Sequence, residues 1–181
     1  MIFTETKLKG AYVIDLEPHE DHRGFFARTY CVKEFSEHGL STEISQCNMS
    51  YTKSKWTVRG MHFQVHPYEE VKLVRCVKGC VLDTIVDLRR NSPTFGQWVS
   101  VELSEENCKA FYVPENFAHG FMSLSDDVIF TYQVSRPYAP GSESGLRWND
   151  PDIGIKWPKT DGVIISDKDK NAPLWRDTFG K

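Results

Sequence analysis

The sequence lacks several features that would assign it to a special class of protein. It has no run of about 18 apolar residues, which a transmembrane helix would need. Its start, MIFTETKLKG, lacks the charged region and apolar stretch of a secretory signal. Basic residues are not in excess either, since 22 Lys and Arg against 25 Asp and Glu give a formal charge of −3. We therefore expect neither a membrane nor a nucleic-acid partner.

Cysteines are few and poorly spaced for cross-linking. The five of them, an odd number without a C-x-x-C pair, are Cys31, Cys47, Cys76, Cys80 and Cys108. This pattern argues against a disulfide framework and against a structural zinc site. We expect the cysteines to be small core residues of a protein in the reducing cytoplasm.

The composition is that of an ordinary globular protein. Apolar residues make up 40% and charged residues 26% of 181 residues. This balance and length suit one domain, residues 1–181, with a sizeable core. Short runs rich in β-branched and aromatic residues, such as TVRGMHFQV and DDVIFTYQV, are separated by turn residues. They predict an all-β sandwich or barrel.

Turn and helix signals divide the chain further. Lys78-Gly79 predicts a hairpin turn, and Asn91-Ser92-Pro93 a longer connection. One short helix is expected over residues 32–38, with Gly39 as its stop. From Pro137 onward the chain is rich in Pro, Gly, Trp and Asp, and we expect it to wrap the sandwich rather than extend it.

The two-residue period of a strand orders the polar side chains. In RGMHFQ, His62 and Gln64 fall on one face and Met61 and Phe63 on the other. In DVIFTYQV, Tyr132 shares a face with Val128, Phe130 and Val134. In VKLVRCV, Lys72 aligns with Val74 and Cys76, although the opposite face of that strand is also apolar.

These positions yield candidates for chemistry, each of which also has a plain structural explanation. A lone strand histidine is more often packed or exposed than catalytic, and Asp169 could simply complete a helix cap with Ser166. The candidates for chemistry are His62, Lys72, Asp83, His119, Tyr132 and Asp169. The candidates for anion binding are Arg23, Arg59, Arg28 and Lys168.

A metal site is the first alternative to weigh. The stretch HFQVHPYEE offers His62, His66, Glu69 and Glu70 as ligands. Gln64 stands two residues after His62, where a further ligand would be expected, and an amide is a poor ligand for iron or zinc. The sequence therefore favours a site without metal.

Taken together, several motifs resemble one family. They are DHRGFF, QCNMS, RGMHFQ, KLVRCVKG, YVPENFAHGF, TYQVSRPYAPGSESGLRWNDPDIGIKWP and SDKD, in order from Asp21 to Asp169. They resemble the dTDP-4-dehydrorhamnose 3,5-epimerases, cupin-fold enzymes that act on sugar nucleotides. The resemblance implies a cupin-type double-stranded β-helix (jelly roll) with a few short helices. It also implies a homodimer with strand exchange near the active site, and no metal or organic cofactor.

The resemblance also implies residue roles. His62 is the base that removes a proton, and Asp169 orients it; Tyr132 is the acid, and Lys72 faces the enolate oxygen. The substrate is a nucleotide-diphosphate 4-keto-6-deoxy sugar, inverted at C3, at C5 or at both. The residues that match substrate-binding positions are Arg23, Arg28, Gln46, Asn48, Arg59, His119, Tyr138, Glu143 and Lys168, of which Tyr138 stacks on the base.

Two positions depart from the family pattern. Arg28 stands where the family usually has a glutamate among the nucleotide-contacting residues, and Cys47 stands where an aspartate is common. A reversed charge at residue 28 would change the base preference, add a phosphate contact, or turn outward to pair with an acid. The identity of the base is therefore open, and the sequence does not separate inversion at C3, at C5 or at both. One alternative is a single-centre epimerase that acts on a non-thymidine sugar nucleotide. A metal-dependent cupin enzyme and a non-catalytic binding module are the remaining alternatives.

Overall fold

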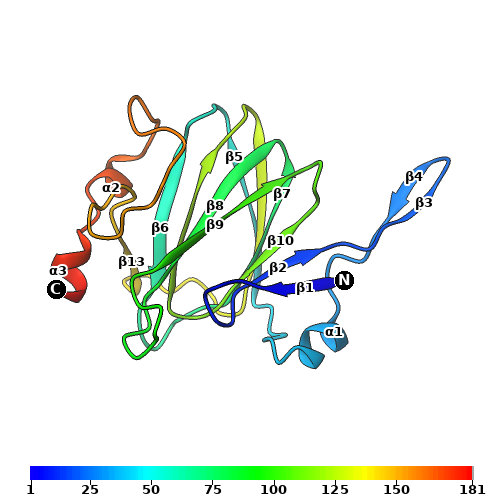
Figure 1. Ribbon diagram of the computed structural model, residues 1–181, viewed down its shortest axis with the longest axis horizontal. Coiled ribbons are helices and arrows are strands. Elements are labelled where there is room, and N and C mark those ends of the chain that lie inside the picture. Colours follow the sequence, from blue (N-terminus) through cyan, green and yellow to red (C-terminus); the bar gives the residue numbers. More distant parts are fainter. Residues whose placement is uncertain (181) are drawn as a thin grey trace.

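Two antiparallel β-sheets face each other in the computed structural model, which describes residues 1–180 (Figure 1). The larger sheet has the order β1-β2-β10-β7-β12-β5 and the smaller one β13-β6-β11-β8-β9. Strands of the larger sheet are β1 Ile2–Glu5, β2 Tyr12–Asp15, β10 Ala110–Val113, β7 Lys72–Lys78, β12 Val128–Val134 and β5 Gln46–Thr52. Those of the smaller sheet are β13 Glu143–Gly145, β6 Val58–Gln64, β11 Phe117–Ser123, β8 Cys80–Asp87 and β9 Trp98–Ser104.

The main core lies between these sheets, as the alternation of side chains predicts. Val74 and Cys76 of β7 and Phe130 of β12 pack against Ile85 of β8 and Phe121 of β11, all with at most 4% of their surface exposed. The expected all-β jelly-roll fold is therefore confirmed. Because both sheets turn their apolar face inward, a polar side chain on the same face must lie in a cavity or find a partner.

The turn and helix predictions are also confirmed. Gly79, with φ +76°, joins β7 to β8. Helix α1 (Val32–Glu37) ends at the cap residue His38, followed by Gly39 with φ +68°. Its Phe35 is buried against the outer side of the larger sheet. None of the helices within residues 1–180 is long and apolar enough to cross a membrane.

The segment from Pro137 onward covers the outer face of the smaller sheet. Met61 and Met122 point outward from that sheet and contact the buried Leu146, Trp148 and Trp157. Helices α2 (Asp167–Lys170) and α3 (Trp175–Phe179) lie in this covering segment. The prediction that this part wraps the sandwich is confirmed, and the wrapping brings α2 beside β6 (Figure 1).

Two glycines allow β6 and β11 to approach closely next to the site. A Cβ on Gly60 would lie 2.6 Å from Cα of Gly120, and a Cβ on Gly120 would lie 2.7 Å from the carbonyl oxygen of Arg59. Gly60 also has φ +120°, which other residues rarely adopt. The register between these strands shifts between His119 and Phe121. The two glycines thus set how Arg59, His62 and His119 lie relative to one another.

The expectation for the cysteines was wrong for most of them. Cys76 is buried in the core, but Cys47 is exposed, and Cys31, Cys80 and Cys108 are partly exposed. All five are free thiols. Cys47 lies on β5, at the edge of the larger sheet, where a period-two pattern cannot say whether the outer face is covered.

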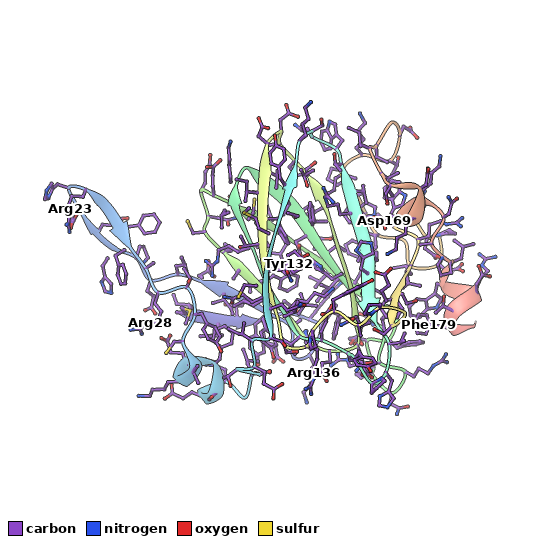
Figure 2. All side chains as sticks on the ribbon, turned by 180° about the vertical axis from the view of Figure 1, so that it is seen from behind. Arg23, Arg28, Tyr132, Arg136, Asp169 and Phe179 are labelled. Carbon is purple, nitrogen blue, oxygen red and sulfur yellow. The ribbon has the colours of Figure 1, made fainter. Side chains whose placement is uncertain are left out.

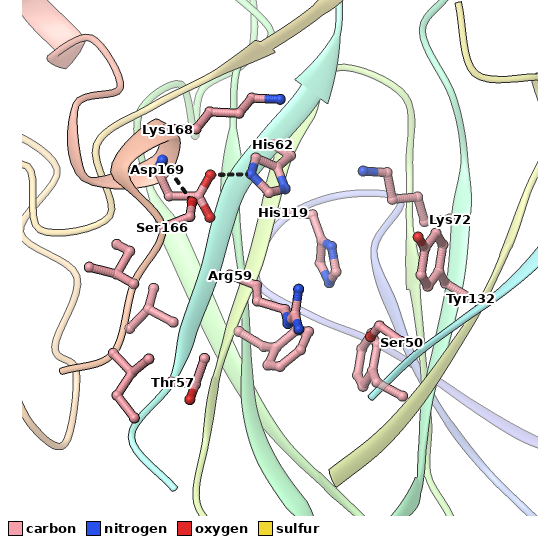
Figure 3. Close-up of a pocket in the computed structure, with 15 residues that line it drawn as sticks. Ser50, Thr57, Arg59, His62, Lys72, His119, Tyr132, Ser166, Lys168 and Asp169 are labelled. Carbon is pink, nitrogen blue, oxygen red and sulfur yellow. Dashed lines mark hydrogen bonds and ion pairs between the residues drawn. The ribbon is translucent and has the colours of Figure 1, made fainter. Parts of the chain in front are cut away.

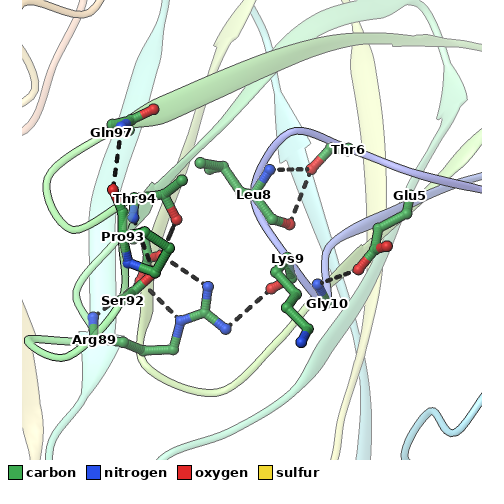
Figure 4. Close-up of polar contacts among 11 residues, drawn as sticks. Glu5, Thr6, Leu8, Lys9, Gly10, Arg89, Ser92, Pro93, Thr94 and Gln97 are labelled. Atoms are coloured by element: carbon green, nitrogen blue, oxygen red, sulfur yellow. Dashed lines mark hydrogen bonds and ion pairs between the residues drawn. The ribbon is translucent and has the colours of Figure 1, made fainter.

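A buried carboxylate fastens two loops at one end of the sandwich (Figure 4). Asp87 accepts hydrogen bonds from Nε and Nη2 of Arg89 at 2.9 and 2.8 Å, and from the hydroxyls of Ser92 and Thr94 at 2.7 Å each. Arg89 in turn donates to the carbonyl oxygen of Lys9 at 3.0 Å. Burial raises the pKa of Asp87, but these bonds outweigh it and lower the pKa to about 2.

This depressed pKa predicts an acid-sensitive contribution to stability. The carboxylate stabilises the fold above its unfolded pKa of 3.8, and the contribution disappears as pH falls through about 2. We expect Asp87→Asn to lower the free energy of unfolding by about 2 kcal/mol at neutral pH and to flatten its pH dependence in this window. Urea unfolding at a series of pH values measures both effects. The exposed Asp161→Asn is the control, and an unchanged acid dependence in Asp87→Asn would contradict the assignment.

Candidate active site

A cavity of about 470 Å³ opens between the two sheets (Figure 3). Its walls come from β5, β6, β7, β11 and β12, and from the segment that contains α2. The lining includes the predicted residues Arg59, His62, Lys72, His119, Tyr132, Lys168 and Asp169. A second cavity of about 410 Å³ adjoins it and shares His62, Lys72, Tyr132 and Lys168. The two form one groove with these four residues at its middle.

His62 and Asp169 form a pair on one wall of this groove. Nε2 of His62 lies 2.7 Å from Oδ1 of Asp169, and Oδ2 accepts the backbone N–H of Gly60 at 3.1 Å. The Asp169 side chain is 7% exposed, whereas that of His62 is 45% exposed. Burial raises the pKa of Asp169, but the bonds from His62 and Gly60 outweigh it and lower the pKa. An ionised carboxylate on Nε2 requires that this nitrogen carries a hydrogen, which leaves Nδ1 with the free lone pair.

The helix-cap explanation for Asp169 is correct only for its backbone. Ser166 is the N-cap of α2, and its hydroxyl accepts the backbone N–H of Asp169 at 3.2 Å. The cap therefore uses the backbone of Asp169 and frees its carboxylate for His62. Structural and functional explanations coexist at this residue because they involve different atoms.

Lys72 and Tyr132 lie on the facing wall (Figure 3). They extend from the neighbouring strands β7 and β12, and Tyr132 is opposite Val74 in the register. The ammonium of Lys72 is 3.2 Å from the carboxylate of Glu70. Both side chains lie on the inner face of the sheet, which confirms the predicted alignment of Lys72 with Val74 and of Tyr132 with Phe130.

A second buried pair joins His119, which lines the cavity, to Asp83. Nε2 of His119 is 2.8 and 3.1 Å from the two oxygens of Asp83, and both residues are buried. Burial raises the pKa of Asp83, and the charges of His119 and Lys72 counteract that rise. The sequence indicated both residues as candidates for chemistry, but it did not predict that they contact each other. Asp83 in the apolar run CVLDTIVD is a buried acid, and such a residue needs a partner.

The adjoining cavity contains most of the remaining predicted contacts. Its lining includes Gln46, Asn48, Tyr138, Glu143 and Lys168. Lys168 and Glu143 form an exposed ion pair at 2.6 Å, and the pair lowers the pKa of Glu143 and raises that of Lys168. Tyr138 is 54% exposed, and its backbone N–H donates to the Gln46 side chain at 3.0 Å. An exposed ring beside cationic and amide groups suits a ligand with a planar base and phosphates.

Arg23 and Arg28 do not reach this groove within one chain (Figure 2). Arg23 is at the tip of the hairpin of β3 (His19–Asp21) and β4 (Gly24–Phe26), which extends away from Tyr132 and Asp169. There it pairs with Asp21. Arg28 forms an ion pair with Glu34 at 2.9 Å. Of the three outcomes expected for an arginine at this position, pairing with an acid is the one found within the chain.

The possible metal ligands of HFQVHPYEE do not converge. His66 is exposed and lies 3.3 Å from Glu69, whereas Glu70 points to Lys72. Within residues 1–180, no three His, Cys, Asp or Glu side chains are grouped in a way that could hold a metal ion.

Comparison with known proteins places the chain in the family that its motifs resemble. The family model of dTDP-4-dehydrorhamnose 3,5-epimerase matches residues 5–177. An epimerase of that name from Methanothermobacter thermautotrophicus is 45% identical over 171 residues, which cover 93% of this chain and 91% of the relative.

Solved structures agree with this placement. The dTDP-4-dehydrorhamnose 3,5-epimerase of Elizabethkingia anophelis superposes with a TM-score of 0.95 at 42% identity, over 98% of each chain. The dTDP-6-deoxy-D-glucose-3,5-epimerase of Legionella pneumophila, in complex with dTDP-4-keto-L-rhamnose, superposes with a TM-score of 0.90 at 38% identity, over 96% of this chain and 92% of the other. The chain therefore belongs to the dTDP-4-dehydrorhamnose 3,5-epimerase family, isomerases of the cupin type that act on sugars.

Proposed function

We propose that the protein inverts C3 and C5 of a dTDP-linked 4-keto-6-deoxyhexose without a cofactor. The observation that carries this proposal is the placement of the His62–Asp169 pair on one wall of a groove and of Lys72 and Tyr132 on the other. A base, a proton donor and a cation around one cavity are the groups that an epimerisation next to a ketone needs.

His62 would begin the reaction. Its Nδ1 removes the proton from the carbon next to the C4 ketone, and the electrons of the broken C–H bond move into an enolate. Asp169 holds Nε2 at 2.7 Å, so it fixes the ring and stabilises the imidazolium that forms. The positive charge of Lys72 stabilises the enolate oxygen by an electrostatic interaction that is in place before the reaction starts.

Tyr132 would complete the inversion. Its hydroxyl returns a proton to the same carbon from the opposite face, and His62 and Tyr132 then exchange protons with water. One proton leaves and one arrives, so no redox change occurs. C3 and C5 both flank the C4 ketone, so the same enolate chemistry applies to each.

The nucleotide part would lie along the groove toward Tyr138. Arg59 and Lys168 supply positive charge for a diphosphate, and a planar guanidinium can engage two phosphate oxygens. Arg59 is held by Thr52 and by the carbonyl oxygen of Tyr51, each at 3.0 Å. His119, Gln46, Asn48 and Glu143 line the same groove, and Tyr138 presents an exposed ring for stacking on the base.

We also propose that the protein acts as a homodimer. The β3–β4 hairpin extends from the body of the chain and exposes Phe25 and Phe26, at 57% and 73%. Strand β5, at the edge of the larger sheet, exposes Met49 at 70%. A second copy would cover these side chains, and its hairpin would bring Arg23 to the groove of the first copy, with Arg28 in the segment that follows the hairpin.

The proposed chemistry predicts exchange with solvent hydrogen. In D₂O, with dTDP-4-keto-6-deoxyglucose and no added metal, we expect deuterium to be incorporated at C3 and C5. NMR measures the rate of incorporation at each carbon. His62→Ala is expected to lower the rate by about 10²–10⁴-fold, the usual contribution of a general base. His66→Ala is the matched control, because His66 is exposed and outside the groove. A His62→Ala protein that exchanges at the full rate would rule out its role, and deuterium at one carbon alone would make the protein a single-centre epimerase.

The dimer proposal predicts complementation between inactive variants. Arg23→Ala and His62→Ala proteins, unfolded and refolded together, would form mixed dimers with one groove that has both intact residues. Random pairing gives roughly a quarter of the wild-type activity. Each variant refolded alone is the control. Activity that stays at the level of the separate variants would show that Arg23 does not serve the partner's groove.

A further inference from the structure

The proposed mechanism gives no part to two polar side chains of the groove, Gln64 and Glu70. Both line the cavity that also contains Lys72 and Tyr138. Gln64 is 6% exposed and the Glu70 side chain 12% exposed, so both are largely removed from water. A buried carboxylate and a buried amide beside a reacting side chain can hold that side chain in place.

Glu70 links Lys72 to Gln64. Its Oε1 is 3.2 Å from the ammonium of Lys72, and its Oε2 accepts the Nε2–H of Gln64 at 3.1 Å. The Lys72 side chain is itself only 12% exposed. Because each carboxylate oxygen of Glu70 has its own partner, the side chain has little freedom to turn, and it holds the ammonium on one side.

Gln64 is in turn fixed by bonds at both ends of its amide. Its oxygen accepts the backbone N–H of Ala139 at 2.9 Å and the hydroxyl of Ser142 at 3.2 Å. Its nitrogen donates to the carbonyl oxygen of Tyr68 at 3.0 Å as well as to Glu70. Reversing the amide would place donors against donors, so its orientation is set by the surrounding groups.

We propose that Glu70 is a positioning residue for Lys72, and that Gln64 anchors Glu70 for this purpose. The inference rests on the function proposed above. Lysine carries a point charge on a flexible four-carbon stem. How strongly it stabilises an enolate therefore depends on where that charge is held. With Glu70 on one side, the remaining N–H donors of the ammonium are directed into the groove.

A purely structural role for Glu70 makes a different prediction. If Glu70 only neutralises a largely buried ammonium, its removal lowers stability but leaves the turnover of the folded protein unchanged. If it positions Lys72, its removal lowers kcat, and the loss requires the presence of Lys72. A double-mutant cycle separates the two roles.

The test compares wild type, Glu70→Ala, Lys72→Met and the double variant in the deuterium-exchange assay. We expect Glu70→Ala to lower kcat by about 10- to 100-fold with little change in KM, since misplacement of a reacting group has effects of this size. We expect no further loss when Glu70→Ala is added to Lys72→Met. Glu69→Ala removes the neighbouring carboxylate, which pairs with the exposed His66, and it should keep wild-type kcat.

Each outcome decides the inference. Losses that multiply in the double variant, or a wild-type kcat in Glu70→Ala, would overturn it. Glu70→Gln keeps the shape of the side chain and one acceptor for Lys72, so its kcat should lie between those of wild type and Glu70→Ala. This variant tests the inference even if Glu70→Ala does not fold. A wild-type protein without any exchange would overturn the proposed function and this inference with it. Wild-type exchange with no effect at Glu70 would overturn the inference alone.

Discussion

The contact between Asp169 and β6 is the interaction on which the groove depends. One carboxylate holds both the ring of His62 and the backbone N–H of Gly60, so it fixes a side chain and its strand together. Asp169 belongs to the C-terminal segment, which packs on the outer face of the smaller sheet through Leu146, Trp148 and Trp157. The apolar contacts of this covering segment are therefore a precondition for the orientation of the base.

The groove is built from charges that are satisfied before any ligand arrives. His119 has Asp83, Lys72 has Glu70, and His62 has Asp169, each on the inward face of a strand or at its edge. A charge without a partner at these depths would be costly, so each pair allows a polar group to remain in an otherwise apolar core. The same pairing removes rotational freedom, and groups that are already oriented need little reorganisation when charge develops on a substrate.

Much of this arrangement could be predicted from the sequence, because strand periodicity states which face a residue occupies. That period placed His62 opposite Met61 and aligned Tyr132 with Phe130, and the turn residues located the hairpin at Gly79. Periodicity does not state which strands become neighbours. The pairing of β6 with β11 brings His62 beside His119, 57 residues along the chain, through a register shift that two glycines permit. For the same reason the bond between Asp83 and His119 and the exposure of Cys47 could not be predicted.

Arg28 shows how a departure from a family pattern can be accommodated locally. Glu34 accepts from both the N-terminal ammonium and Arg28, and these bonds lower its pKa to about 2. The reversed charge at residue 28 therefore has an acid nearby within its own chain. A carboxylate at this position could only accept hydrogen bonds from a nucleotide, whereas a guanidinium donates them and has five N–H groups, of which the bond to Glu34 uses one. If the proposed dimer brings Arg28 to a nucleotide, the guanidinium would recognise an acceptor, such as a carbonyl of the base or a phosphate oxygen, where a glutamate would recognise a donor.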